Sequence, residues 1–357
     1  MQKKDKKDTI WIISTIILII ISCGLTASVT IYIDPLFHYH EPLAEYEYPL
    51  NNDRYQNDGI TRNFDYDGII TGSSMVANFM TSEAKQIFDA DFIKVPFFGG
   101  TYKEINDNLL RAFDSGKNIR YVINCLDYSR LIQDKDAYRT DIDYPTYLYN
   151  DIWLDDVSYI LNKEILFNQT RNVVKYTKAG NKTTNFDDYL NWNANYTFGA
   201  ETVMSTYTLG EKMKEERTLT ENESTMVLEN IRQNVTELAY AHPETVFYLF
   251  FPPYSICYWD DLHNKGQVNW RIDAEQIAIR EILRCPNINL YSFCDNFGLI
   301  CNLNNYKDSA HYGEWVNSWI LQQMNNDIFL LTEDNYVDYI KKIREFYNSF
   351  DYESLHK

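Results

Sequence analysis

The sequence predicts an α/β protein, a three-layer α/β/α sandwich with a central parallel sheet, to which one N-terminal transmembrane helix is added. Two observations lead to this prediction. Short apolar runs alternate with helix-like segments along most of the chain, and this order is typical of parallel strands joined by crossover helices. A separate, much longer apolar run lies near the N-terminus.

The long apolar run, residues 10–33, contains no charged residue. At about 1.5 Å per residue it can cross a hydrocarbon core of roughly 30 Å. Four lysines precede it: Lys3, Lys4, Lys6 and Lys7. Acidic residues follow it, with no Lys or Arg before Arg54. This asymmetry predicts a single-pass protein of the cell membrane, with residues 1–9 in the cytoplasm and residues 34–357 outside.

Two other interpretations of this run stay open. A signal peptide could be cleaved near the small residues Ala27 and Val29, although the run is longer than a usual signal-peptide core. The sequence Ile20-Ile21-Ser22-Cys23 loosely resembles a lipoprotein signal, although the run continues about ten residues past Cys23. Both alternatives also place the main domain outside the membrane.

Composition narrows the class of protein. The chain has 357 residues, including 29 Tyr, 19 Phe and 7 Trp, which supports a folded core. A net charge of −18 argues against nucleic acid or an anionic membrane surface as partner of the bulk domain. One pair among Cys285, Cys294 and Cys301 could be oxidised outside the cell. No CxxC pair occurs, so a zinc site is unsupported. We expect neither a metal nor a cofactor.

The expected elements come from apolar periodicity. Strands are expected at residues 67–71, 92–98, 121–126, 246–251 and 288–293. Helices are expected at residues 82–90, 102–113, 226–240, 274–283, 314–329 and 335–350. Residues 131–224 break this alternation because they are polar and aromatic with few apolar runs. We expect them to form an insertion packed over or beside the edge of the sheet.

Candidate catalytic residues follow strands, where active groups of such folds lie. Gly72-Ser73-Ser74 directly follows the first strand. A serine at such a turn projects its hydroxyl above the sheet, and neighbouring N–H groups can face an oxyanion. A plain turn with a helix cap would have the same sequence. Gly99-Gly100 ends the second strand, so the Gly100 N–H is a candidate oxyanion donor or part of a tight turn.

A candidate base lies near the C-terminus, in Asp308-Ser309-Ala310-His311. At this spacing the aspartate can accept a hydrogen bond from one imidazole nitrogen and leave the other as general base for a serine. The alternative is again a helix cap. A second Asp-x-x-His occurs at Asp260-Asp261-Leu262-His263, without an equally good place in the predicted fold. The sequence His38-Tyr39-His40-Glu41 could bind metal but lacks partners, and we expect it to be an interface segment.

Together these segments resemble, in order along about 250 residues, the SGNH (GDSL-like) hydrolase superfamily. The resemblance implies that Ser74 is the nucleophile, that Asp308 and His311 complete the triad, and that the Ser74 and Gly100 N–H groups bind the oxyanion. Leu126 stands where the family has an oxyanion-hole Asn, so Asn124 or another group substitutes, or the hole has only backbone donors.

A second departure from the family's pattern indicates a branch. Ser73 replaces the family's first-block Asp. This looks like the membrane-anchored bacterial branch that includes the D-alanyl transfer protein of the teichoic acid pathway and the alginate O-acetylation proteins.

The resemblance implies a membrane-anchored extracytoplasmic serine esterase or O-acyltransferase. Its substrate would be an acyl ester of a cell-surface polysaccharide or teichoic-type polymer, and a membrane O-acyltransferase is a candidate partner. A second hypothesis is a non-catalytic binding or scaffold subunit of a wall-polymer complex, in which the aromatic insertion stacks on sugars. A third is a peptide or lipid hydrolase with the same triad.

Overall fold

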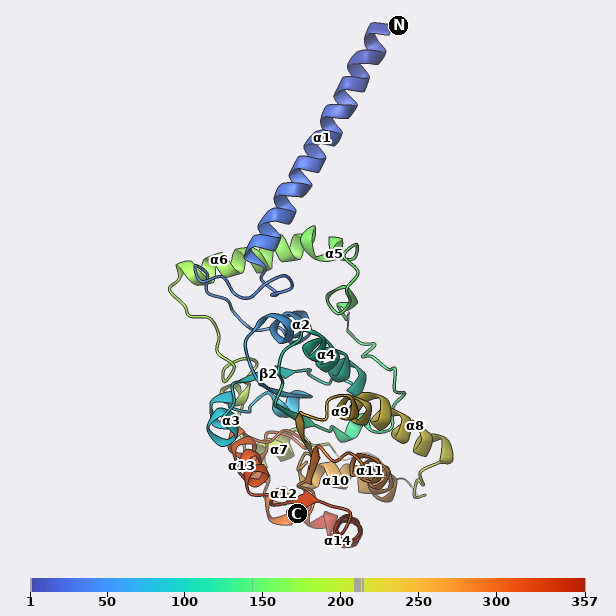
Figure 1. Ribbon diagram of the computed structural model, residues 1–357. Helices are drawn as coiled ribbons and strands as arrows, with labels where there is room; N and C mark the ends of the chain where they lie inside the picture. The colour runs from blue at the N-terminus through green and yellow to red at the C-terminus, as the bar shows by residue number, and fades with distance from the viewer. Residues whose placement is uncertain (1, 143, 209–212, 214, 357) are drawn as a thin grey trace. The chain divides into compact units, whose positions relative to one another are not determined.

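A computed structural model describes residues 2–142, 144–208, 213 and 215–356 (Figure 1). The chain forms two compact units: unit 1 is Met1–Phe64 with Pro145–Thr184, and unit 2 is Asp65–Tyr144 with Asn185–Lys357. The expected insertion, residues 131–224, is therefore divided between the units. Its residues 143, 209–212 and 214, together with Met1 and Lys357, lie outside the described residues.

Unit 1 begins with the long helix α1 (Gln2–Ile33), and this helix is long and apolar enough to span a membrane. It ends at the residue expected from the sequence and begins earlier. The remaining helical elements of unit 1 are α2 (Asp53–Asn63), η3 (Thr146–Leu148), α5 (Val157–Ile160), η4 (Ile165–Thr170) and α6 (Arg171–Lys178).

The end of α1 is fixed by a buried aspartate. Asp34 has φ +44° and is fully buried. Its carboxylate accepts hydrogen bonds from three backbone N–H groups that follow it and, at 2.6 Å, from the hydroxyl of Tyr159. Tyr159 also packs with Leu36, Leu148 and Ile165 in a buried apolar cluster. These contacts attach the segment of α5 and η4 to the end of α1.

Unit 2 contains a six-stranded sheet. Its strands are β1 (Gly68–Gly72), β2 (Phe92–Pro96), β3 (Tyr121–Cys125), β4 (Val246–Phe251), β5 (Ile288–Ser292) and β6 (Leu330–Leu331). The order across the sheet is β2-β1-β3-β4-β5-β6, and all neighbours are parallel except β5 and β6. The first five strands are confirmed to within two residues. The sixth was missed, so the sheet is mostly rather than entirely parallel.

The expected helix over residues 314–329 is wrong at its end. Helix α13 (Glu314–Asn325) stops earlier, and Asp327 and Phe329 adopt left-handed backbone conformations with φ +53° and +67°. Non-glycine residues rarely adopt this conformation, which is incompatible with a continuing helix. The chain thus turns back into β6, antiparallel to β5.

Helices cover both faces of the sheet. The remaining α-helices of unit 2 are α3 (Thr81–Phe88), α4 (Tyr102–Asp114), α7 (Ala200–Thr206), α8 (Glu221–Ile231), α9 (Glu237–Ala241), α10 (Ile256–Asn264), α11 (Val268–Ile282), α12 (Phe297–Ile300) and α14 (Tyr336–Ser349). Short helical turns are η1 (Ser74–Val76), η2 (Tyr128–Arg130), η5 (Asn193–Asn195), η6 (Arg232–Thr236), η7 (Leu303–Asn305) and η8 (Tyr352–His356). Helix α3 contacts α13, and α11 contacts α8 and α14. The α/β class with helices on both faces is therefore confirmed.

The strand order determines where a ligand is expected. From β1 the chain first adds β2 on one side and then β3 on the other. Ligands of doubly wound sheets bind beyond the carboxyl ends of the strands where this reversal occurs. Ser74 lies two residues after the end of β1, at this position.

Candidate active site

The turn after β1 exposes the Ser74 hydroxyl. Gly72 has φ +142°, and a Cβ at this position would lie 2.8 Å from the Cβ of Cys125, so only glycine fits between β1 and β3. The helical turn η1 then begins at Ser74, whose neighbours Ser73 and Met75 are buried while Ser74 itself is half-buried. Its Oγ lies 2.8 Å from Nε2 of His311.

His311 is oriented by Asp308 within one tight turn. Oδ1 of Asp308 accepts hydrogen bonds from the backbone N–H groups of Ala310 and His311, at 2.9 and 2.8 Å. Oδ2 of Asp308 lies 2.9 Å from Nδ1 of His311. The structure thus brings Ser74, His311 and Asp308 into one hydrogen-bonded chain from segments far apart in the sequence. Their catalytic roles stay predictions.

The environment keeps Asp308 ionised. Burial alone would raise its pKa, but the hydrogen bond and charge of His311 and the backbone N–H groups of Ala310 and His311 hold that pKa well below the usual value. A carboxylate with this environment can stabilise an imidazolium and fix the tautomer that leaves Nε2 as the base.

Lys307 is a further member of the site that the sequence analysis missed. Its Nζ lies 3.1 Å from Oδ2 of Asp308, and its ammonium also lies over two aromatic rings, 4.0 Å from the centroid of Tyr196 and 4.9 Å from that of Trp192. Cations are attracted to the faces of such rings. A lysine directly before the Asp-x-x-His sequence was the only available signal.

Trp192 connects the expected insertion to the site. Its indole N–H points to the carbonyl of Ser74 at 3.4 Å, and its ring contacts that of His311 edge-on, with centroids 5.6 Å apart. Its backbone N–H donates to Oδ1 of Asn78, and Oδ1 of the next residue, Asn193, accepts from the N–H of Glu314. These contacts place the segment around Trp192 against the loops that carry Ser74 and His311.

A buried lysine links the segment after Ser74 to the segment before Trp192. Lys94, in β2, is fully buried, and its Nζ donates to the carbonyls of Ala77, Phe79 and Asp187 at 2.5, 3.0 and 3.1 Å. Three carbonyls match the three hydrogens of an ammonium group. Lys94 thereby ties the chain just after Ser74 to the chain just before Trp192. Burial lowers its pKa to about 7.

The candidate oxyanion donors differ in whether they already make a hydrogen bond within the protein. The Ser74 N–H makes no hydrogen bond to any described residue. The Gly100 N–H donates to the carbonyl of Phe97 at 2.7 Å, and a Cβ on Gly100 would lie 2.5 Å from the Cβ of Phe97. This is the tight turn considered as the alternative, and in this conformation the N–H is engaged. Asn124 is buried in β3 beside β1, and its Oδ1 has no partner among the described residues.

The other candidates lie elsewhere. Asp260 and His263 are in α10, where Asp260 accepts from Tyr207 and His356, and His263 stacks on Tyr352. His38 contacts Asp156 and Arg62 within unit 1.

The disulfide considered among Cys285, Cys294 and Cys301 is not formed, since all six cysteines are free.

Comparison with models of known protein families gave no match for this chain, and comparison with curated protein sequences gave none either. The assignment of a function therefore depends on the site itself.

Proposed function

We propose that the protein is a serine esterase or O-acyltransferase of the SGNH type, anchored by α1. The observation that carries the proposal is the chain of contacts from Ser74 Oγ to His311 Nε2 and from His311 Nδ1 to Asp308. This is the arrangement by which a base activates a serine and a carboxylate orients the base. Its position after β1, at the reversal of strand order, supports a role in ligand binding.

The chemistry proceeds in two steps. Ser74 Oγ attacks the ester carbonyl carbon while Nε2 of His311 takes its proton, and the Ser74 N–H and the Asn124 amide are the candidate donors to the oxyanion. The bond to the alcohol then breaks, and His311 gives the proton to the departing oxygen. Water or a sugar hydroxyl next attacks the acyl-serine and passes its proton to His311, which returns it to Ser74.

The substrate follows from the anchor and the resemblance together. Lysines precede the apolar run and acidic residues follow it, so we place the catalytic unit outside the cell. There it would meet acyl esters, such as acetyl or alanyl groups, on a surface polysaccharide or teichoic-type polymer. A membrane O-acyltransferase would be the partner that supplies the acyl group.

The test is a fluorophosphonate probe applied to the full chain in detergent or nanodiscs. We expect labelling of wild type, loss of labelling in Ser74→Ala and His311→Ala, and retained labelling in His263→Ala, whose imidazole lies in α10. Equal labelling of wild type and Ser74→Ala would show that another residue reacts and that the proposed site is wrong.

A second candidate function is a non-catalytic scaffold that binds the polymer. Two observations favour it: Leu126 stands where the family has its Asn, and the Gly100 N–H is engaged with Phe97. An absence of labelling in folded wild type, combined with binding to acylated wall polymer, would support this function instead.

A further inference from the structure

Unit 1 exposes a group of large apolar side chains next to the end of α1. They lie in and just before α5 and η4: Ile152, Trp153, Leu154, Val157, Leu161 and Phe167. Trp153 is 75% exposed and Phe167 64% exposed. Several large apolar side chains exposed within one short segment are a feature of interaction sites. We call these six residues the apolar patch.

The patch is held in place by the other side of the same segment. Tyr159, Ile165 and Val173 are buried, and Tyr159 bonds to Asp34 directly after α1. Helix α5 and η4 both contact α1, and Figure 1 shows the segment of α5 and α6 lying across the end of α1. The segment therefore has one apolar side packed within unit 1 and a second apolar side exposed near the point where the apolar run of α1 ends.

The charge of this segment differs from that of the whole chain. Residues 152–178 contain four basic residues, Lys163, Arg171, Lys175 and Lys178, against three acidic residues, Asp155, Asp156 and Glu164, whereas the whole chain has a net charge of −18. Arg171 and Lys175 are exposed, and their side chains make no ion pair or hydrogen bond to any residue in the described part of the chain. The argument against an anionic membrane surface, made for the bulk domain, does not hold for this segment.

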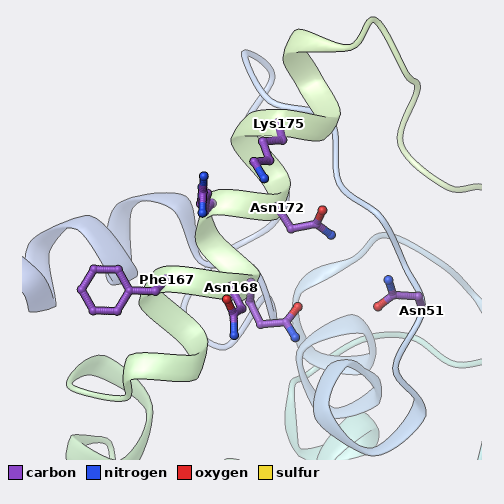
Figure 2. Close-up of a pocket in the computed structure, with 7 residues that line it drawn as sticks. Asn51, Phe167, Asn168, Asn172 and Lys175 are labelled. Atoms are coloured by element: carbon purple, nitrogen blue, oxygen red, sulfur yellow. The ribbon is translucent and has the colours of Figure 1, made fainter.

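A pocket of about 300 Å³ opens beside these cations. It is lined by amide side chains, including Asn51, Asn168 and Asn172, together with Phe167, Arg171 and Lys175. Figure 2 shows Asn172 and Asn51 extending toward one another while Phe167 projects away from them. Amide and cationic donors around a small polar space are suited to an anionic group such as a lipid phosphate.

We propose that the segment of residues 152–178 binds the surface of the bilayer that α1 spans. The apolar patch inserts at the boundary between headgroups and acyl chains, Arg171 and Lys175 contact phosphates of anionic lipids, and the pocket accommodates one headgroup. Interfacial helices combine an apolar side carrying Trp or Phe with basic residues in this way, and Trp is typical of the membrane–water interface. This inference rests on the anchoring by α1 and is independent of catalysis at Ser74.

The test uses the full chain in nanodiscs of equal parts phosphatidylglycerol and phosphatidylcholine, with bromine placed either shallow or deep on the acyl chains. Bromine quenches tryptophan fluorescence at short range. We expect the Trp153→Phe variant to lose a quenched component, with stronger quenching from the shallow bromine than from the deep one. The control is Trp315→Phe, which removes a partly exposed tryptophan of unit 2 and should leave that component in place.

A second variant tests the phosphate contacts. We expect Arg171→Gln combined with Lys175→Gln to weaken the quenching of Trp153 in anionic discs, while Lys341→Gln, an exposed lysine in α14, has no effect. Chain that assembles into discs with an unquenched Trp153 overturns the proposal and leaves the anchoring intact. Chain that does not enter discs at all contradicts the anchoring itself. Equal quenching in anionic and purely zwitterionic discs, unchanged by the double variant, overturns the phosphate contacts.

Discussion

Nζ of Lys307 lies 3.1 Å from Oδ2 of Asp308, the same oxygen that lies 2.9 Å from Nδ1 of His311. One carboxylate oxygen therefore faces two cationic partners whenever His311 is protonated. The ammonium is held there by the rings of Trp192 and Tyr196. The Asp308 carboxylate therefore interacts with two groups at once: it orients His311, and it forms an ion pair with Lys307. We call this the charge division.

Replacing Lys307 should change the pH dependence of the reaction. Lys307→Met removes a positive charge from beside Asp308, and this favours the protonated form of the adjacent imidazole. The acidic limb of the pH–rate profile should therefore move to higher pH. The measurement is the rate of fluorophosphonate labelling from pH 5 to 9. The control is Lys265→Met, which breaks the ion pair between Lys265, directly after α10, and Asp261 within it. An unchanged acidic limb would contradict the charge division.

Asp308→Asn should retain the fold and lose most of the activity. The amide no longer stabilises the imidazolium or selects the tautomer, and losses of roughly 10³ to 10⁴ in rate are typical of such changes. The pKa of Asp308 is depressed, so its stabilising contribution is present above the unfolded pKa of about 3.9 and is lost as pH falls through the folded pKa. The difference in Tm between wild type and variant should therefore shrink as the solution is made strongly acidic.

The parts of the site that could be predicted from the sequence are those set by short spacings. Ser74 follows an apolar run that ends in glycine, and Asp308 and His311 fit one turn, so local rules locate all three. The five long strands were predictable for the same reason, because each is a continuous apolar run. The strand Leu330–Leu331 has only two residues and no periodicity to reveal it.

The remaining parts depend on contacts between distant segments. Trp192 lies in a polar stretch without periodicity, and its neighbours in the fold, Ser74 and His311, are more than a hundred residues away on either side. Likewise, the assignment of residues 145–184 to unit 1 depends on contacts such as that of Tyr159 with Asp34. No local composition marks either position.

Lys94 should make stability depend on pH. Burial lowers its pKa in the folded chain to about 7, while an unfolded lysine titrates near about 10.4. Between these values the unfolded chain binds more protons, so the free energy of unfolding should rise with pH by up to about 1.4 kcal/mol per unit. Below pH 7 this dependence should vanish. In Lys94→Met the slope between pH 7 and 9 should be lost, measured by thermal unfolding of the full chain, whereas Lys341→Met should keep it.

Trp192 should affect the site through its ring as well as its N–H group. Trp192→Phe keeps an aromatic ring and loses the contact with the Ser74 carbonyl. We therefore expect the activation free energy of labelling to rise by about 1 kcal/mol. Trp192→Ala also removes the edge contact with His311 and the platform under Lys307, so its labelling rate should fall further. Equal rates for both variants would show that the ring makes no contribution.

A substitution at Gly100 can distinguish the two interpretations of this residue, as an oxyanion donor or as part of a tight turn. In Gly100→Ala the new Cβ would lie 2.5 Å from the Cβ of Phe97, and such overpacking typically costs about 1 to 3 kcal/mol of stability. The matched control is Gly298→Ala, where the nearest atom to a Cβ is 3.8 Å away, so its Tm should stay close to that of wild type.

The alanine at position 100 still carries an N–H group. If this turn is structural, the fraction of Gly100→Ala that remains folded should label at the wild-type rate, since the N–H is engaged with Phe97 in either case. A folded variant that labels far more slowly would instead indicate that the turn opens and that this N–H binds the oxyanion. Measuring Tm and labelling rate on the same sample distinguishes the two.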